Sequence, residues 1–147
     1  MIQIAGITGN TEVDLSRRGL IAMCADNGVV EEGVTQTGQE VTAIVAENFL
    51  KYDTSVGVMC KQNHAEIFPV DMGMVTDTKV RTDHKIAYGT QNMTKGPAMT
   101  REQAVKGLEA GIDMVRELND KGYRILATRG NGESEIQPPA VQLLLCC

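Results

Sequence analysis

The stretch from Leu20 to Thr42 limits the possible folds more than any other part of the chain. The apolar run Leu20–Cys24 stops at Ala25-Asp26-Asn27-Gly28, and a glycine-spaced acidic loop then leads to Thr37 and Glu40. This order predicts a strand, a polar loop at its carboxyl end and then a helix. Open α/β sheets bind their ligands at that place, outside the carboxyl ends of parallel strands.

The loop is expected to end in a capping box, Thr37-Gly38-Gln39-Glu40, that starts the helix. The apolar stripe of this helix, expected to face the sheet, consists of Val41, Ile44, Val45 and Phe49. A further helix is predicted from Thr54 to about Gln62, with Asp53 or Thr54 as its N-cap. Its inward residues are predicted to be Val56, Met59 and Cys60.

The remaining chain continues the alternation of strands and helices. A second strand is predicted over Glu66–Gly73, although Pro69 lacks the amide that a central strand donates, and 76–89 is expected to be a loop or short strand. Thr100 and Gln103 predict a capping box for a helix that ends near Asp120, before Gly122. Its predicted inward stripe is Ala104, Leu108, Ile112, Val115 and Leu118. A strand beginning at Tyr123–Ala127 completes an α/β pattern with a mostly parallel sheet.

Composition excludes several classes of function. The net charge of −5 and the aromatic content of 3% argue against a nucleic-acid binder. The sequence has no apolar run of about 18 residues and no signal peptide, so no membrane partner and a cytoplasmic location are expected. The cysteines (Cys24, Cys60, Cys146 and Cys147) lack metal-type spacing. We expect free thiols and no metal site.

Asp26, Asn27, Glu31 and Glu32 are the candidates for chemistry in the first loop. A carboxylate here can serve as acid, base or hydrogen-bond acceptor for a ligand. The commoner alternative is that Asp26 caps a turn and the two glutamates are solvated. A second polar loop, 89–100, leads into a helix N-terminus, which attracts anions, but it contains neither a Walker loop nor a dinucleotide fingerprint.

Together the two loops resemble the nicotinate-nucleotide:dimethylbenzimidazole phosphoribosyltransferase family. The family pattern ADHGVVEEGVS…EVT is similar to ADNGVVEEGVTQTGQEVT at 25–42, and GTxNxxxGPAMTREQA is similar to GTQNMTKGPAMTREQA at 89–104. Val70-Asp71-Met72-Gly73 stands where the family has V-D-V-G. The resemblance covers most of the chain from Ile4 to Thr128.

The resemblance implies a three-layer, mostly parallel Rossmann-like sheet with flanking helices, incomplete relative to the family. It also implies phosphoribose transfer from nicotinate mononucleotide to dimethylbenzimidazole, a step of cobalamin biosynthesis, with no cofactor. The products are α-ribazole phosphate and nicotinate. Family members resemble homodimers. The substrate-binding residues that it implies are Asp26, Asn27 (where the family usually has His), Gly28, Thr37 and Val45.

The ends of the chain depart from the family pattern. The family's K-P-P-G-S-L-G-R-L-E-like motif is absent before Met1, and its catalytic glutamate would lie beyond Cys147, so no catalytic residue is predicted here. We expect a partial domain over 1–128 and an atypical segment over 129–147. Suitable codons for the family's G-I-G-N-T-T-T-S-S-A, read from the second nucleotide, give ESEIQPPAV, which is identical to 133–141. A frameshifted, truncated product is the resulting hypothesis.

Three functional hypotheses follow. The leading one is a phosphoribosyltransferase fragment that is inactive alone. The others are a non-catalytic ligand-binding or interaction remnant, and a truncated product that folds poorly because an exposed sheet edge invites aggregation.

Overall fold

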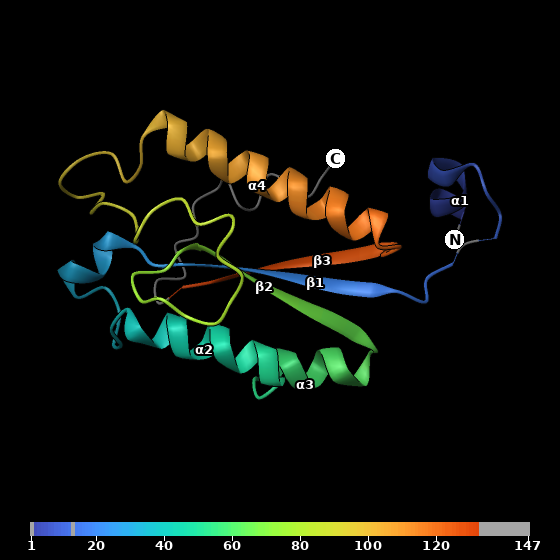
Figure 1. Ribbon diagram of the computed structural model, residues 1–147, viewed down its shortest axis with the longest axis horizontal. Coiled ribbons are helices and arrows are strands. Elements are labelled where there is room, and N and C mark those ends of the chain that lie inside the picture. Colours follow the sequence, from blue (N-terminus) through green and yellow to red (C-terminus); the bar gives the residue numbers. More distant parts are fainter. Residues whose placement is uncertain (1, 13, 133–147) are drawn as a thin grey trace.

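Three parallel strands form the centre of the structure, and helices lie on both faces of them (Figure 1). The computed structural model describes residues 2–12 and 14–132. Its elements are α1 (Ile2–Thr8), β1 (Arg18–Ala25), the 3-10 helix η1 (Gly28–Glu32), α2 (Glu40–Lys51), α3 (Ser55–Gln62), β2 (Ala65–Gly73), α4 (Arg101–Asp120) and β3 (Ile125–Asn131).

The strand order is β2-β1-β3, and both pairs are parallel, with Met23 opposite Val70 on one side and Gly130 on the other. From β1 the chain passes through α2 and α3 to β2, and it returns through α4 to β3 on the far side of β1. Figure 1 shows α2 and α3 on one face and α4 on the other. The predicted α/β fold with a parallel sheet is confirmed. The chain continues from β1 to a neighbour on one side and then to a neighbour on the other side, and open sheets commonly bind ligands near such a change in strand order.

Alternate residues of β1 supply the two halves of the core. Ile21 and Met23 pack with Met114 and Leu118 of α4, while Ala22 and Cys24 belong to the cluster that contains Phe49 of α2. This alternation is the normal consequence of side chains pointing to opposite faces of a strand. The strand is continuously apolar because both of its faces are covered.

Two of the three predicted helix starts are confirmed. Thr100 Oγ1 accepts from the Gln103 amide at 3.2 Å and Gln103 Oε1 accepts from the Thr100 amide at 2.8 Å, which completes the capping box of α4. Thr54 Oγ1 accepts from the Gly57 amide at 2.9 Å and caps α3.

The predicted capping box at Thr37 is wrong. The N-cap of α2 is Gln39, with no side-chain cap hydrogen bond, and the helix begins at Glu40. The Thr37 amide instead donates to Thr35 Oγ1 at 3.1 Å, while the Val41 amide donates to the Gly38 carbonyl at 3.3 Å. A local turn around Thr35 therefore replaces the cap.

The predicted inward stripes are only partly correct. Met59, Ile44 and Ile112 are 61%, 56% and 42% exposed, and Leu108 is 37% exposed. The residues of α2 and α4 that are buried are Thr42, Ala43, Ala46, Phe49, Ala110, Gly111, Met114 and Leu118. Small residues dominate this set, because they let a helix lie close against the sheet.

The strand boundaries also differ from the prediction. Pro69 lies within β2 opposite Ala22, which an edge strand tolerates because one side of it needs no amide. Buried Tyr123 precedes β3, which runs to Asn131 and so continues past Thr128. The sequence did not predict α1. The segment 133–147, to which the frameshift hypothesis applies, lies outside the described residues.

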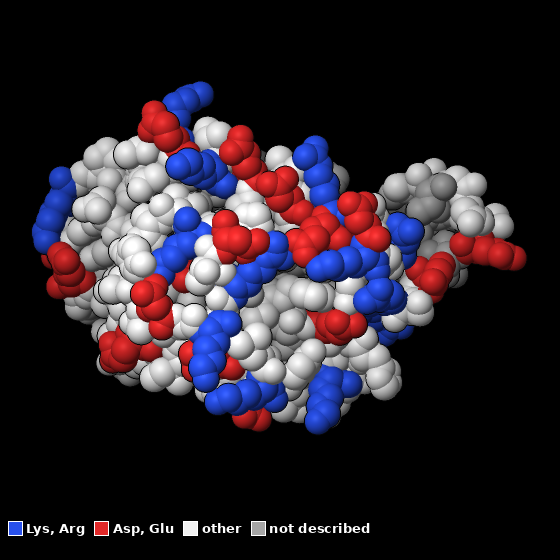
Figure 2. All heavy atoms as spheres, viewed as in Figure 1, with Lys and Arg blue, Asp and Glu red and all other residues white. Residues whose placement is uncertain are grey.

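The connection from Met74 to Thr100, between β2 and α4, contains no helix and only an isolated bridge at Arg81, as expected for 76–89. Within the described ranges, no helix is both long and apolar enough to cross a bilayer. Figure 2 shows acidic and basic side chains interspersed over the face in view.

Candidate functional site

The two glycine-containing loops meet at the carboxyl ends of β1 and β2. The Thr90 amide donates to the Asp26 carbonyl at 3.0 Å, and the Gly28 amide donates to Thr90 Oγ1 at 3.2 Å. The Gly73 carbonyl accepts from the amides of both Asp26 and Gly89 at 3.0 Å. Backbone hydrogen bonds therefore hold the loops together at the place where the sequence predicts a ligand site.

Asp26 is fully buried and joins the first loop to the connection after β2. Its Oδ2 accepts from the Val75 amide at 2.7 Å, so the carboxylate binds a distant segment rather than capping its own turn. Asp26 Oδ1 is buried and has no hydrogen-bond partner among the described residues. Asn27, also buried, accepts from Gln39 Nε2 through its carbonyl at 3.2 Å.

The two glutamates of the first loop are exposed, and both contact side chains of the second loop. Glu32 Oε1 accepts from Asn92 Nδ2 at 2.6 Å and from Thr94 Oγ1 at 3.2 Å. Glu31 Oε2 lies 2.8 Å from Lys95 Nζ, and this hydrogen bond lowers the pKa of the Glu31 carboxyl. Glu32 therefore bridges the two loops through these hydrogen bonds, whereas the exposed pair of Glu31 with Lys95 contributes little.

Two hollows adjoin this junction. One is an apolar cavity between the strand ends and the start of α4. It is lined by Ala25, Met72, Gly73, Ile86, Ala87, Gly89, Thr90, Gln91, Ala98, Met99, Gln103, Ala104 and Gly107. The other is a polar cleft beside η1. It is lined by Gly28, Glu31, Gln39, Val75, Tyr88, Thr90, Gln91, Asn92, Lys95, Gly96 and Pro97. Thr90 and Gln91 line both hollows, so the cavity and the cleft are neighbours.

The structure brings together some of the predicted site residues and separates others. Asp26, Asn27 and Gly28 are consecutive at the loop junction, and Gly28 lines the cleft. Thr37 is exposed on the loop before α2 and lines neither hollow. Val45 is half-buried and packs against the cluster under α2, on the opposite face of the sheet from α4.

Several cavity residues were missed as site candidates. Ile86, Met72 and Gln103 lie on three different segments, and nothing in their spacing relates them to one another. Thr90 and Gln91 belong to the second glycine loop, which was a usable signal, because that loop was already singled out as polar and as leading into a helix.

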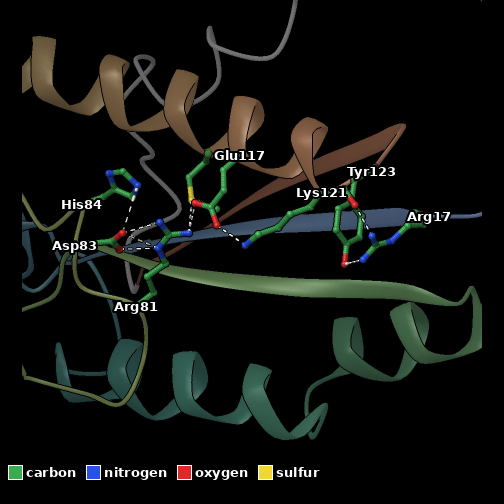
Figure 3. Close-up of polar contacts among 8 residues, drawn as sticks. Arg17, Arg81, Asp83, His84, Glu117, Lys121 and Tyr123 are labelled. Atoms are coloured by element: carbon green, nitrogen blue, oxygen red, sulfur yellow. Dashed lines mark hydrogen bonds and ion pairs between the residues drawn. The ribbon is translucent and has the colours of Figure 1, made fainter.

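Arg81 attaches the connection after β2 to α4. Its guanidinium lies 2.6 Å from a carboxylate oxygen of Asp83 and 2.6 Å from one of Glu117 (Figure 3). The hydrogen bond to Asp83 is the largest cause of the raised pKa of Arg81. His84 lies beside the same Asp83, at 3.9 Å. In the described part of the chain, no three His, Cys, Asp or Glu side chains are grouped so that they could hold a metal ion.

Comparisons with known proteins identify relatives of this chain. A family model described as "Phosphoribosyltransferase" matches residues 1–141. The chain is 44% identical over 137 residues to the nicotinate-nucleotide–dimethylbenzimidazole phosphoribosyltransferase of Clostridium tetani, covering 92% of this chain and 37% of the relative. With the Clostridium acetobutylicum enzyme of the same name it shares 40% over 149 residues, covering 99% and 42%.

The fold has a counterpart of known structure. A crystal structure of the enzyme of that name from Thermus thermophilus is similar with a TM-score of 0.82 and 31% identity, covering 90% of this chain and 41% of that one. The chain thus spans roughly two fifths of the length of the relatives it matches, between 37% and 42% in these three cases.

Proposed function

Because the chain belongs to the nicotinate-nucleotide–dimethylbenzimidazole phosphoribosyltransferase family, we propose that its described part binds the acceptor base of that reaction in the apolar cavity. The nucleotide's polar groups would occupy the adjoining cleft. The observation that carries this proposal is that Thr90 and Gln91 line both hollows. An aromatic base and a sugar phosphate bound side by side need such a pair of sites.

The cavity and the cleft suit the two reactants chemically. Dimethylbenzimidazole is flat and mostly apolar, and the cavity offers methyl, methylene and thioether groups from residues such as Ile86, Met99 and Ala104. In the family's reaction a benzimidazole nitrogen attacks the anomeric carbon of the nucleotide, nicotinate leaves, and a base takes the benzimidazole proton. Holding the nitrogen close to the carbon supplies a large part of such a rate enhancement.

The described residues position substrates in this proposal and supply no general base. Glu31 and Glu32 are bound by Lys95, Asn92 and Thr94. Asp26 has one oxygen engaged by Val75, and it lines neither hollow. We therefore expect the chain to bind dimethylbenzimidazole without turning it over by itself.

A binding experiment with a matched pair of variants tests the site. Dimethylbenzimidazole is titrated into the purified chain by calorimetry, alongside Ala104→Leu and Val105→Leu. Ala104 lines the cavity, whereas Val105 is 42% exposed on the same helix. We expect A104L to weaken binding at least tenfold and V105L to leave it unchanged. Absent wild-type binding, or equal binding by A104L, would refute the cavity assignment.

A turnover assay tests the second half of the proposal. The chain is incubated with nicotinate mononucleotide and dimethylbenzimidazole, and α-ribazole phosphate and nicotinate are separated by chromatography. Binding without product supports a positioning role. Product formation at a substantial rate would show that this chain contains a base after all.

A further inference from the structure

The connection from Met74 to Thr100 builds one wall of both hollows although it has no regular structure of its own. A long segment without helix or strand in a compact domain usually has a function. It follows the outer edge of β2, where the Asp71 amide donates to the Arg81 carbonyl at 2.8 Å and the Ile86 amide donates to the Met72 carbonyl at 3.0 Å. These backbone hydrogen bonds set the path of the connection, and side-chain contacts hold it in that position.

The principal attachment point is Asp71, near the carboxyl end of β2. This residue is fully buried. Its Oδ1 accepts from the amides of Gly73 and Met74 at 2.9 and 2.7 Å. Its Oδ2 accepts no hydrogen bond from the described residues but forms an ion pair with Lys85, with 3.1 Å between Oδ2 and Nζ. A buried carboxylate needs such a cation, because an unpaired charge in the interior is very costly.

The Lys85 ammonium contacts three side chains. Besides Asp71, its ammonium lies 3.0 Å from Asp77 Oδ1 and 3.9 Å from the centre of the Tyr88 ring. Only 12% of its side chain is exposed. Burial by itself would lower the pKa of Lys85, but the nearby carboxylates of Asp77 and Asp71 outweigh burial and leave the pKa above its ordinary value. The lysine stays charged throughout the physiological range.

We propose that Lys85 is a positioning residue for the site: by binding Asp71 it fixes Ile86 and Ala87 as a wall of the apolar cavity and Tyr88 as a wall of the polar cleft. These residues directly follow Lys85 in the sequence, and Lys85 itself lines neither hollow. Its effect on a ligand is therefore indirect. The expected effect on ligand binding rests on the proposed function, whereas the ordering of residues 86–88 rests only on the contacts of Lys85.

Arg81 does not serve the same purpose, although it lies on the same connection. Its ion pairs with Asp83 and Glu117 join side chains that are 36%, 52% and 31% exposed (Figure 3), and such pairs contribute little. They also attach the connection to α4 rather than to the buried end of β2, and Arg81 does not adjoin the cavity-lining residues that begin at Ile86. Lys85 is the cation that pairs with a fully buried carboxylate and directly precedes those residues.

The test compares Lys85→Met with Lys79→Met, which replaces an exposed lysine on the same connection. Dimethylbenzimidazole affinity is measured by calorimetry at a temperature where circular dichroism shows each variant to be folded. We expect K85M to raise the dissociation constant at least tenfold and K79M to leave it unchanged. Equal affinity in folded K85M and wild type would overturn the proposal.

Hydrogen exchange gives a second readout that does not depend on the ligand. In K85M we expect the amides of 86–91 to exchange at least tenfold faster, while those of α4 keep their wild-type rates. A uniform acceleration over the whole chain would mean that Lys85 contributes only to global stability, and no acceleration at 86–91 would overturn the positioning role. Failure of wild type to bind dimethylbenzimidazole would refute the proposed function. The exchange rates at 86–91 would then still test whether Lys85 positions these residues.

Asp71→Asn tests the same ion pair from the other side if K85M does not fold. It keeps the shape of the side chain and an oxygen for the Gly73 and Met74 amides, but it removes the charge that holds Lys85. We expect the same loss of dimethylbenzimidazole affinity and the same faster amide exchange at 86–91 as in K85M. A folded D71N with wild-type affinity and wild-type exchange would contradict the inference.

Discussion

Gly28 and Thr90 are so close that no side chain fits between them. A Cβ atom placed at Gly28 would lie 2.6 Å from the Thr90 carbonyl oxygen and 2.7 Å from the Asn92 amide nitrogen. Both neighbours are backbone atoms, which cannot rotate away as a flexible side chain can. The contact between the two loops, and hence the wall shared by the cavity and the cleft, depends on glycine at this position.

Gly28→Ala should separate the loops. We expect the free energy of unfolding to fall by about 1–3 kcal/mol, as in other overpacked sites, and dimethylbenzimidazole binding to weaken with it. Urea denaturation followed by circular dichroism measures the first effect. Gly96→Ala is the control for the stability measurement, because a Cβ there meets nothing within 4 Å. Equal stability of G28A and wild type would show that the loops are not joined as described.

The capping box of α4 makes a separate prediction about stability. Thr100→Ala removes the hydroxyl that accepts from the Gln103 amide, and the loss should be about 1 kcal/mol. Thr100→Ser keeps the hydroxyl and should retain most of the stability. Because Gln103 also lines the apolar cavity, T100A should weaken ligand binding slightly. An equal loss in T100S and T100A would assign the effect to the methyl group instead.

The Arg81 network predicts a pH dependence with a definite sign. Hydrogen bonding to Arg81 lowers the pKa of Asp83 below its ordinary value of 3.8. Lys121, and then Arg81, lower the pKa of Glu117 below 4.5. A lowered pKa in the folded state stabilises the protein above the unfolded pKa, and this contribution is lost as the pH falls through the folded value.

Arg81→Met should therefore cost at most about 1 kcal/mol near neutral pH, since these pairs are partly exposed. The difference from wild type should shrink as the pH falls below about 4. Urea unfolding at a series of pH values checks this. Arg116→Met removes a more exposed partner, 3.9 Å from Asp113, and should leave the profile unchanged. A difference that grows toward low pH would contradict the sign.

Cys24 should be chemically inert in the folded protein. Burial raises the pKa of its thiol to about 12, so only about one molecule in ten thousand carries the reactive thiolate at pH 8. Iodoacetamide labelling followed by peptide mass spectrometry should modify Cys24 only after denaturant is added. Rapid labelling under native conditions would show that β1 opens far more readily than a covered central strand should.

Local patterns in the sequence were sufficient for the fold class and for most element positions. The strand before Asp26, the caps at Thr54 and Thr100 and the loop after β2 were all predicted, and all are present. The two caps depend on contacts within a few residues, such as the hydrogen bond from the Gln103 amide to Thr100, which sequence spacing encodes directly. The stripes of α2 and α4 were partly wrong because small residues such as Ala43, Ala46 and Ala110 are buried where Ile44, Leu108 and Ile112 were expected.

Residue order alone was enough to predict that a polar loop follows β1 and that a second glycine loop precedes α4, since both features are local. The contact between these loops depends instead on the folded chain. The Asp26 carboxylate binds the amide of Val75, 49 residues away, and Glu31 pairs with Lys95, 64 residues away. These residues meet because the parallel sheet brings the ends of β1 and β2 together. No local sequence pattern predicts which distant residues will meet there, and the cavity and the cleft form only where they do.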